Sequence, residues 1–318
     1  SPRRPLSAPK NIQISKKSKH SLTLEELYLK PIINWDEKIT NRWTVSEKAA
    51  QQRLDEFVLD ELQDYRDGRN FPDKDNVSRL SPYLHFGQIS PNTAWYRALD
   101  ASALIANEKS LDTFLSELGW REFSYYLLYH FPHLPHKNLQ SKFDAFPWPK
   151  TQASILRLWK SGKTGYPLVD AGMRELYSTG YMHNRVRMVV GSFLVKNLLI
   201  HWHEGESWFW DCLVDADLAS NSAVWQWIAG CGADAAPYFR IFNPITQSEK
   251  FDKQGNYIRR YVPELANMPD KFIHAPWLAP EHILKEAGIE IDVNYPAPVV
   301  DIKMSRALAL EAFAQTKT

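Results

Sequence analysis

Apolar residues recur at helical spacing along most of this chain. Between Trp43 and Leu62 the apolar positions 49, 54, 57, 58 and 62 fit a helix that Thr44 or Ser46 can cap. Loops marked by proline or glycine separate further helical segments at 91–106, 110–130, 151–161, 167–179, 183–201, 206–213 and 221–229. Alternating strand patterns are almost absent, and there is no internal repeat or GxGxxG loop. The pattern predicts an all-α fold.

Two regions depart from this periodicity. Residues 1–40 are rich in serine, proline and lysine and are predicted to form a linker or extended arm ahead of one helical domain, 41–318. The segment 64–76 is predicted to be a turn-rich loop. The longest apolar run, 189–200, is interrupted by two polar residues, so it predicts a buried helix rather than a membrane span of about 20 apolar residues.

Composition narrows the possible functions. The 318 residues carry a formal net charge of +1, so any nucleic-acid site has to be a local patch. Cys212 and Cys231 have no CxxC spacing and no nearby histidine pair, which predicts a reducing, cytoplasmic setting and no metal site. Twelve tryptophans exceed what packing needs and indicate stacking or electron-transfer roles.

The stretch 211–247 has the composition of a cofactor site. It holds the acids Asp215 and Asp217, then Asn221 and a tryptophan pair that begins at Trp225, with small residues between them. No histidine or further carboxylate stands at metal-ligand spacing, so the acids are expected to pair with an arginine or accept from a ligand N–H. We predict a site for an aromatic cofactor with hydrogen-bonding edges.

Two helices carry polar faces that suit ligand binding. Glu117, Trp120, Arg121 and Ser124 share one face, next to an apolar stripe at 111, 114, 115 and 118 that is expected in the core. This face can clamp a flat, anionic ligand; the alternative is a surface helix with a Glu–Arg pair at i,i+4. A second face suits amide recognition, or is a satisfied helix edge, and comprises Asn184, Arg187, Met188 and Gly191, with Gly191 leaving room for an approaching group.

Two further segments are candidates for binding phosphate. Ser78, Arg79 and Ser81 precede a helix and form a candidate anion site. Near the C-terminus basic residues interleave with Gln247 and Tyr257, which suits contact with a phosphate backbone, or else forms a solvated loop. These basic residues are Arg240, Lys250, Lys253, Arg259 and Arg260.

Six segments together resemble the flavin-binding helical half of the photolyase/cryptochrome family. In family order they are SRLSPYLHFGQISP, ELGWREF, GKTGYPLVDAGMREL, GYMHNRVRMVVGSFLVK, DADLASNSAVWQW and PYFRIFNPITQ. They cover nearly everything from Trp43 to about Trp277. The resemblance implies FAD, folded into a U inside the helical bundle. Family members normally carry an N-terminal α/β antenna domain, which this sequence lacks, so no antenna chromophore is expected on the chain, and a monomer is expected.

The resemblance also assigns cofactor contacts. The positions around the phosphates match Tyr65, Val77, Ser78, Arg79, Leu80 and Ser81. Val77 departs from the family pattern, because that position usually holds a hydroxyl residue. Asp215 and Asp217 match acids near the flavin and its ribityl or ribose groups. Arg187 is expected to pair with Asp215. Asn221 matches the residue at flavin N5, where asparagine is typical of repair enzymes.

Substrate and electron-transfer positions follow in the same way. Glu117 and Trp120 match the pair that meets a flipped-out pyrimidine dimer, and further substrate or DNA positions match Arg121, Asn184, Arg185, Met188 and Gln247. Asn184 after His183 favours the cyclobutane dimer, since repair of the (6-4) lesion goes with two histidines there. The family's photoreduction chain matches Trp225, Trp202 and Trp148, with Trp225 nearest the flavin.

The function that the resemblance implies is light-driven repair of cyclobutane pyrimidine dimers in DNA. Reduced FAD would pass an electron to the flipped-out dimer, which makes the protein a carbon–carbon lyase with damaged DNA as its partner. The alternatives are a blue-light signalling flavoprotein of the cryptochrome type and a DASH-type enzyme that repairs single strands.

Overall fold

The computed structural model describes residues 1–13, 21–102, 107–234 and 240–317. These residues form helices and turns, and within them the only pairing of extended backbone is an isolated bridge between Ile291 and Tyr295. The predicted all-α fold is confirmed. The end of the predicted helix 91–106 and residues 237–239 of the last matched segment lie outside the described ranges.

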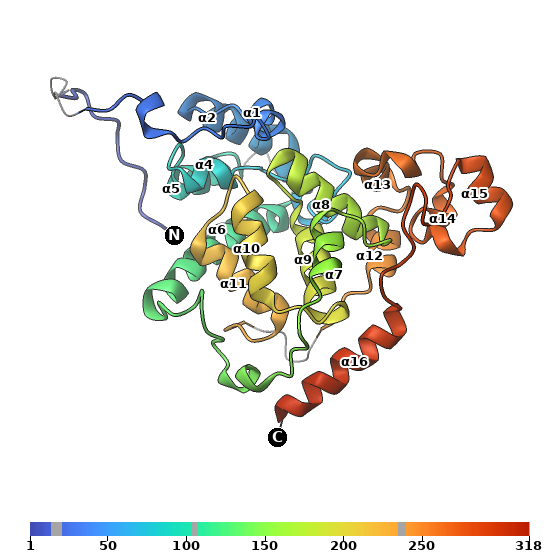
Figure 1. Ribbon diagram of the computed structural model, residues 1–318. Helices are drawn as coiled ribbons and strands as arrows, with labels where there is room; N and C mark the ends of the chain where they lie inside the picture. The colour runs from blue at the N-terminus through green and yellow to red at the C-terminus, as the bar shows by residue number, and fades with distance from the viewer. Residues whose placement is uncertain (14–20, 103–106, 235–239, 318) are drawn as a thin grey trace.

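The helices divide into three successive groups, linked in places by short 3-10 turns (Figure 1). The first group is α1 (Glu37–Arg42), α2 (Glu47–Glu56), the π-turn η2 (Phe57–Glu61), α3 (Tyr65–Gly68), α4 (Ser81–His85), α5 (Pro91–Asp100) and α6 (Glu108–His130). The second is α7 (Ala153–Lys160), α8 (Pro167–Thr179), α9 (Asn184–Ser192), the π-turn η6 (Phe193–Asn197), α10 (Trp202–Cys212) and α11 (Leu218–Ala229). The third is α12 (Pro244–Phe251), α13 (Asn256–Tyr261), α14 (Asp270–Ile273), α15 (Glu281–Ala287) and α16 (Ile302–Ala314).

Buried apolar side chains gather in two clusters. The first cluster joins α2, α4, α5 and the start of α6, and it contains the apolar stripe of α6 that was expected in the core. The second cluster is larger and joins α7 to α11 with α13 and α16. The two clusters meet where α6 packs on α11. This seam between the clusters places the candidate site.

Capping side chains set the starts of three helices, one of them at a predicted cap and two of them earlier than the apolar pattern placed them. Trp43, the first residue of the predicted segment, has an extended backbone between α1 and α2, and of the two predicted caps Ser46 is confirmed. α2 begins four residues later, because Ser46 Oγ accepts the N–H of Ala49 at 3.0 Å. The segments predicted at 206–213 and 221–229 both begin earlier, since His201 caps α10 and Asp217 caps α11.

The segment predicted as one helix at 183–201 consists of α9 followed by the π-turn η6. Its apolar run is buried, as expected. The two polar interruptions are buried with partners: Asn197 Nδ2 donates to Ser305 Oγ of α16 at 2.9 Å, and Lys196 Nζ donates to the Arg240 carbonyl. None of the described helices is both long enough and apolar enough to cross a bilayer.

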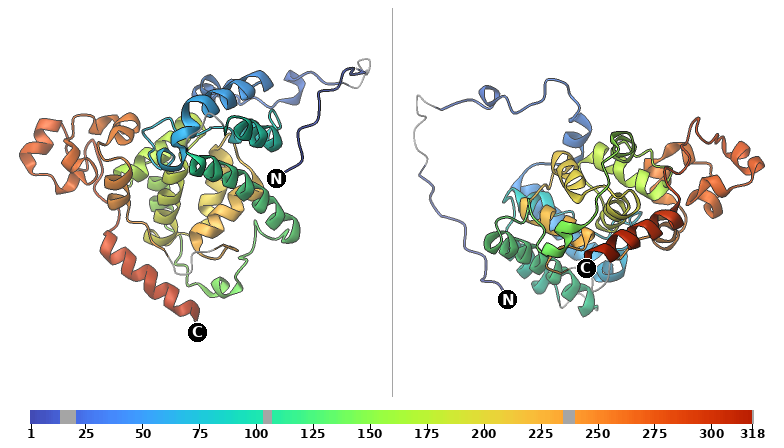
Figure 2. Two further views of the ribbon diagram at one scale, coloured as in Figure 1. Left: turned by 180° about the vertical axis from the view of Figure 1, so that it is seen from behind. Right: turned by 60° about the horizontal axis from the view of Figure 1, so that its bottom comes forward.

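The N-terminal arm is exposed along its described parts and loops away from the helical body (Figure 2). Its first residues return to α5, where Tyr96 Oη donates to the Pro2 carbonyl at 2.6 Å. At its other end α1 already begins at Glu37, inside the stretch predicted to be an arm. Trp43 Nε1 then donates to the Thr179 carbonyl at 2.9 Å and fastens this end to α8. The loop predicted at 64–76 contains the short helix α3.

Candidate functional site

A cavity of about 340 Å³ lies at the seam between the two clusters. Its volume is within the range of about 300–1,000 Å³ that is usual for small-molecule sites. Apolar walls come from both clusters, among them Phe114 and Leu118 on one side and Phe209 and Ile228 on the other. The predicted site residues that line it are Tyr65, Val77, Ser78, Arg79, Leu80, Ser81, Glu117, Trp120, Arg121, Asn184, Arg187, Asp215, Asp217, Asn221 and Trp225.

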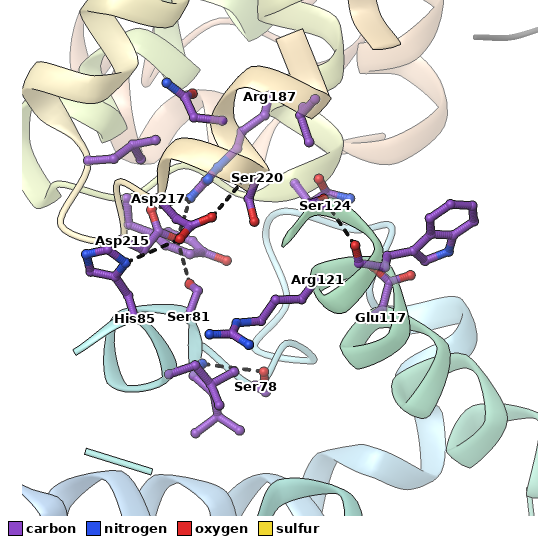
Figure 3. A pocket seen from close by; sticks show the side chains of 18 of the residues that line it. Ser78, Ser81, His85, Glu117, Arg121, Ser124, Arg187, Asp215, Asp217 and Ser220 are labelled. Atoms are coloured by element: carbon purple, nitrogen blue, oxygen red, sulfur yellow. Dashed lines mark hydrogen bonds and ion pairs between the residues drawn. The ribbon is translucent and has the colours of Figure 1, made fainter. Parts of the chain in front are cut away.

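Asp215 links the two clusters across the cavity. Its carboxylate accepts from Arg187 Nη2 at 3.1 Å, as expected, and from Ser81 Oγ of α4 at 2.6 Å (Figure 3). Burial is the largest single influence on the Arg187 guanidinium and disfavours its charge. The charge and hydrogen bond of Asp215, together with Tyr181 and Glu175, outweigh burial, so the pKa of Arg187 is raised. A charged pair is thus fixed in the wall of the cavity.

Asp217 faces the same space and also begins α11. Its Oδ1 accepts the N–H of Ser220 at 2.8 Å as the helix cap, and its Oδ2 accepts from Tyr125 Oη of α6 at 2.5 Å. His85 Nδ1 lies 3.6 Å from the same carboxylate (Figure 3). Burial raises the pKa of Asp217, but these hydrogen bonds outweigh burial and the net shift is downward. Asp217 therefore presents a negative charge to the cavity.

The segment 77–81 forms a concave turn of backbone before α4. Arg79 has a φ of 51°, in the left-handed region, and Leu80 is right-handed with a φ of −84°. Such an alternation turns successive N–H groups to one side and favours anion binding. Among the described residues, the N–H groups of Ser78, Arg79 and Ser81 have no hydrogen-bond acceptor. The turn therefore suits the phosphates of a nucleotide cofactor.

Glu117 pairs with an arginine that sequence reasoning missed. The alternative of a Glu117–Arg121 pair is wrong, because Glu117 accepts from Arg69 Nη1 whereas Arg121 donates to Glu122 at 2.8 Å. Arg69 lies just after α3, in the segment predicted only as turns, and its guanidinium sits 5.3 Å above the Tyr65 ring. Arg121 is left to extend from α6 toward the cavity (Figure 3).

Asn221 and Asn184 approach the cavity from different helices. Asn221 Nδ2 donates to the Glu206 carbonyl of α10 at 3.0 Å, so its Oδ1 remains as an acceptor. This orientation suits a ligand N–H. Asn184 lines both this cavity and a neighbouring one.

The neighbouring cavity is rich in arginine. Arg66, Arg69, Asn70, Thr113, Asn184, Arg185 and Met188 line it. Arg185 Nη2 donates to Asn70 Oδ1, and its guanidinium lies 4.5 Å above the Phe251 ring. Burial together with the charges of Arg69 and Arg240 lowers the pKa of Arg185, as expected for a cation without an anionic partner beside it. Arg185 and Met188 thus border this second space rather than the main cavity.

The three predicted electron-transfer tryptophans fall into two places. Trp225 is buried and lines the cavity, and its closest ring neighbours are Phe209 at 5.0 Å and Trp159 at 6.4 Å. Trp202 and Trp148 do not line the cavity, and both contact the His201 ring, with ring centroids 5.6 Å and 4.9 Å from it. Sequence reasoning missed Trp159, which lies on the apolar face of the short helix α7 and is completely buried.

Three further residues that were predicted to face a ligand or DNA make contacts within the protein instead. Gly191 leaves room for Ile228 of α11 rather than for a ligand: a Cβ on Gly191 would lie 2.6 Å from Ile228 Cδ1. Tyr257 is fully buried and donates to Glu175, and Arg259 pairs with Asp270 at 2.8 Å, so neither is free to contact DNA.

Gln247 lies on α12, outside both cavities. The predicted DNA contact of Gln247 therefore does not belong to either candidate binding space.

The residues of the main cavity fit a dinucleotide with an aromatic ring system. Unpaired backbone N–H groups can hold phosphates, Asp217 can accept hydroxyl or N–H groups, and Asn221 presents an amide oxygen. Trp225 and the apolar walls can cover a flat ring.

Comparison with known proteins identifies the family. The family described as "FAD binding domain of DNA photolyase" matches residues 114–315. The chain is 49% identical to a deoxyribodipyrimidine photo-lyase of Agrobacterium fabrum, over 99% of this chain and 66% of that protein. It is 41% identical to cryptochrome-2 of Arabidopsis thaliana, over 88% of this chain and 46% of that protein.

A solved structure agrees with this similarity. The crystal structure of a bacterial class III photolyase from Agrobacterium tumefaciens matches with a TM-score of 0.89 and 49% identity, over 98% of this chain and 63% of that one. The chain belongs to the family of photolyase FAD-binding domains, and FAD, the cofactor predicted from the sequence, is confirmed. The chain spans less than two thirds of the length of these relatives.

Proposed function

We propose that this protein repairs cyclobutane pyrimidine dimers in DNA by light-driven electron transfer from reduced FAD. The observation that carries the proposal is one cavity lined both by cofactor-type residues, such as Asp215 and Asn221, and by the partly buried Glu117 next to the exposed Trp120. A flavin against the inner wall and a pyrimidine dimer at the outer wall would then be neighbours. The photo-lyase names of its relatives support the same activity.

The dimer would enter the cavity from the side of α6. A dimer is out of reach inside duplex DNA and has to be flipped out, at a cost of a few kcal/mol that its weakened pairing lowers. Trp120 is half exposed at 50% and offers its indole for stacking, which contributes about 1–3 kcal/mol per base. Arg185, in the adjacent arginine-lined cavity, would hold a backbone phosphate.

The pair Arg69–Glu117 would bind and polarise the dimer. Because Arg69 holds one carboxylate oxygen of Glu117, the other can accept from a pyrimidine N–H. When reduced FAD is bound and excited by light, it supplies one electron to the dimer. The positive charge of Arg69 would stabilise the dimer while it carries this electron, until the two carbon–carbon bonds between the rings have broken and the electron has gone back to the flavin. No net redox change results.

The choice of lesion rests on Asn184. This residue lines the cavity next to buried His183, whose Nδ1 accepts from the Arg185 N–H at 3.2 Å. An amide at position 184 offers a neutral donor and acceptor but no titratable proton. A lesion whose repair needs no proton transfer, the cyclobutane dimer, fits this site better than the (6-4) lesion.

Repair assays on the FAD-loaded, reduced protein test the proposal. Under near-UV light, Glu117→Ala is expected to lower the repair rate of a dimer-containing oligonucleotide by about 100-fold, the effect of losing one preorganised charged contact. Trp120→Ala is expected to weaken binding of the same oligonucleotide about tenfold. Asp112→Ala, on the exposed side of α6, is the matched control and should change neither quantity. Unchanged repair in both test variants would rule out this assignment of the cavity.

The second candidate is a blue-light photoreceptor of the cryptochrome type, which the 41% identity to cryptochrome-2 of Arabidopsis thaliana favours. Wild-type protein that is photoreduced but repairs no dimer would support that function. A DASH-type enzyme would repair dimers in single-stranded DNA and leave the duplex substrate unchanged.

A further inference from the structure

Arg53 holds the backbone of the candidate phosphate turn from outside the cavity. Its Nε donates to the Ser78 carbonyl at 2.9 Å, and its Nη2 donates to the Val77 carbonyl at 3.0 Å. Arg53 is not among the residues that line the cavity, whereas Val77 and Ser78 are. The guanidinium therefore binds two successive carbonyls of the turn without lining the cavity itself.

These two hydrogen bonds fix the direction of two backbone N–H groups. In a trans peptide the C=O and the N–H of one plane point in opposite directions. The plane that carries the Val77 carbonyl also carries the Ser78 N–H, and the next plane joins the Ser78 carbonyl to the Arg79 N–H. Both carbonyls point to Arg53, so both N–H groups point away from it, and among the described residues neither has an acceptor.

Glu61 fixes Arg53 in turn. Its two carboxylate oxygens lie 2.7 and 2.6 Å from Arg53 Nη2. Two turns of an α-helix take about seven residues, but Arg53 and Glu61 are eight apart. The π-turn η2 between them adds a residue to one turn and returns Glu61 to the face of Arg53. Burial is the largest influence on the pKa of Glu61 and raises it, against the charge of Arg53.

We propose that the Arg53–Glu61 pair positions the FAD diphosphate indirectly. The pair holds the backbone of residues 77–79, so that the N–H groups of Ser78 and Arg79 are already oriented to donate to the phosphates. The inference rests on the proposed placement of FAD in the main cavity. It also accounts for Val77: this position offers no hydroxyl to a phosphate, and backbone N–H groups held in place supply the contact instead. Arg53 itself touches no ligand.

Binding to the flavin-free protein tests this inference, with FAD and riboflavin as paired probes. Riboflavin has the ring system but no phosphate, so the ratio of the two dissociation constants reports on the phosphate turn. Arg53→Met is expected to weaken FAD binding about tenfold and to change riboflavin binding less than twofold. Arg53→Lys keeps the charge opposite Glu61 but lacks the planar fork that reaches two carbonyls, and it should show the same selective loss.

The matched control is Arg97→Met. Arg97 pairs with Asp55 of α2 at 2.7 Å and contacts neither the turn nor the cavity, so both constants should stay as in wild type. Inorganic pyrophosphate should compete with FAD in wild type and much less in Arg53→Lys. Equal weakening of FAD and riboflavin, or no weakening of either, in a folded Arg53→Lys protein would overturn the inference. Failure of wild type itself to bind FAD would instead overturn the placement of the cofactor.

Discussion

Single side chains of the cavity serve the fold and the site together. Asp217 caps α11 through the Ser220 N–H and also takes a hydrogen bond from Tyr125 across the cavity. Asn221 is oriented by the backbone carbonyl of Glu206, while the Glu206 carboxyl group bonds Ser222 one residue further on. α10 and α11 are thus joined directly behind the predicted flavin position, so changes at these residues should affect stability and cofactor chemistry together.

Glu206 should make stability depend on pH. Burial raises its pKa from 4.5 to about 7, with Ser222 acting in the opposite direction. Between these values the unfolded chain loses the proton and the folded chain keeps it, so stability falls as the pH rises from 4.5 to 7. Glu206→Gln removes this loss and should gain on the order of 1 kcal/mol over wild type above pH 7. Urea unfolding at several pH values measures the difference.

Glu204→Gln serves as the control, on the same helix α10. Its stability should follow wild type across the whole pH range. If the Glu206→Gln curve also stayed parallel to wild type between pH 5 and 8, Glu206 would not be the buried acid that the structure indicates.

The regular helices could largely be predicted from the sequence, but the π-turns, the caps that begin α10 and α11 and the ion pair of Arg69 could not. The stripes of α6 and α8 follow the 3.6-residue period, so their bounds were close to the predicted ones. The π-turns and the early caps leave no periodic signal, because the caps His201 and Asp217 act on N–H groups only two and three residues ahead. The pairing of Arg69 depends instead on Glu117, which is 48 residues away in the chain.

Helical spacing already singled out candidate residues such as Glu117, Trp120 and Arg187. The resemblance to a family added the roles, together with residues that no local pattern had marked: Tyr65, Val77, Leu80, Arg185, Trp202 and Trp148.

The contact between α10 and α11 depends on Gly205. A Cβ at this position would lie 2.1 Å from the Trp225 ring, so Gly205→Ala has to displace that indole. We expect a loss of stability of about 1–3 kcal/mol, the usual cost of overpacking, and slower photoreduction of bound flavin because Trp225 moves. Thermal unfolding and flavin absorbance under blue light measure the two effects.

Gly119→Ala in α6 is the matched control, because nothing lies within 4 Å of an added Cβ there. Glycine inside a helix costs about 0.5–1 kcal/mol relative to alanine, so this variant should be slightly more stable than wild type. A Gly205→Ala protein as stable as Gly119→Ala would show that the indole is not tightly held.

At the scale of the whole molecule, the cavity exists because two hydrophobic clusters meet without filling their seam. Its lining runs from Tyr65 to Ile228, so no local window of sequence contains it. Hydrogen bonds connect the two sides of the seam, among them those from Ser81 to Asp215 and from Tyr125 to Asp217. Whether two such clusters enclose a space is decided by how α6 packs on α11, and that packing has no signature in the residue pattern of either helix.

A ligand that bridges the seam should therefore stabilise both clusters as one unit. At a free FAD concentration about 1,000 times the dissociation constant, linkage adds about 4 kcal/mol to the free energy of unfolding. For a chain of 318 residues this corresponds to a rise in the unfolding temperature of about 6 °C. Scanning calorimetry of the flavin-free protein with added FAD measures the rise. NAD⁺, which shares the diphosphate and adenosine but lacks the isoalloxazine, is the control and should give a much smaller shift. Two separate transitions, of which FAD moves only one, would mean that the cofactor contacts a single cluster and does not span the seam.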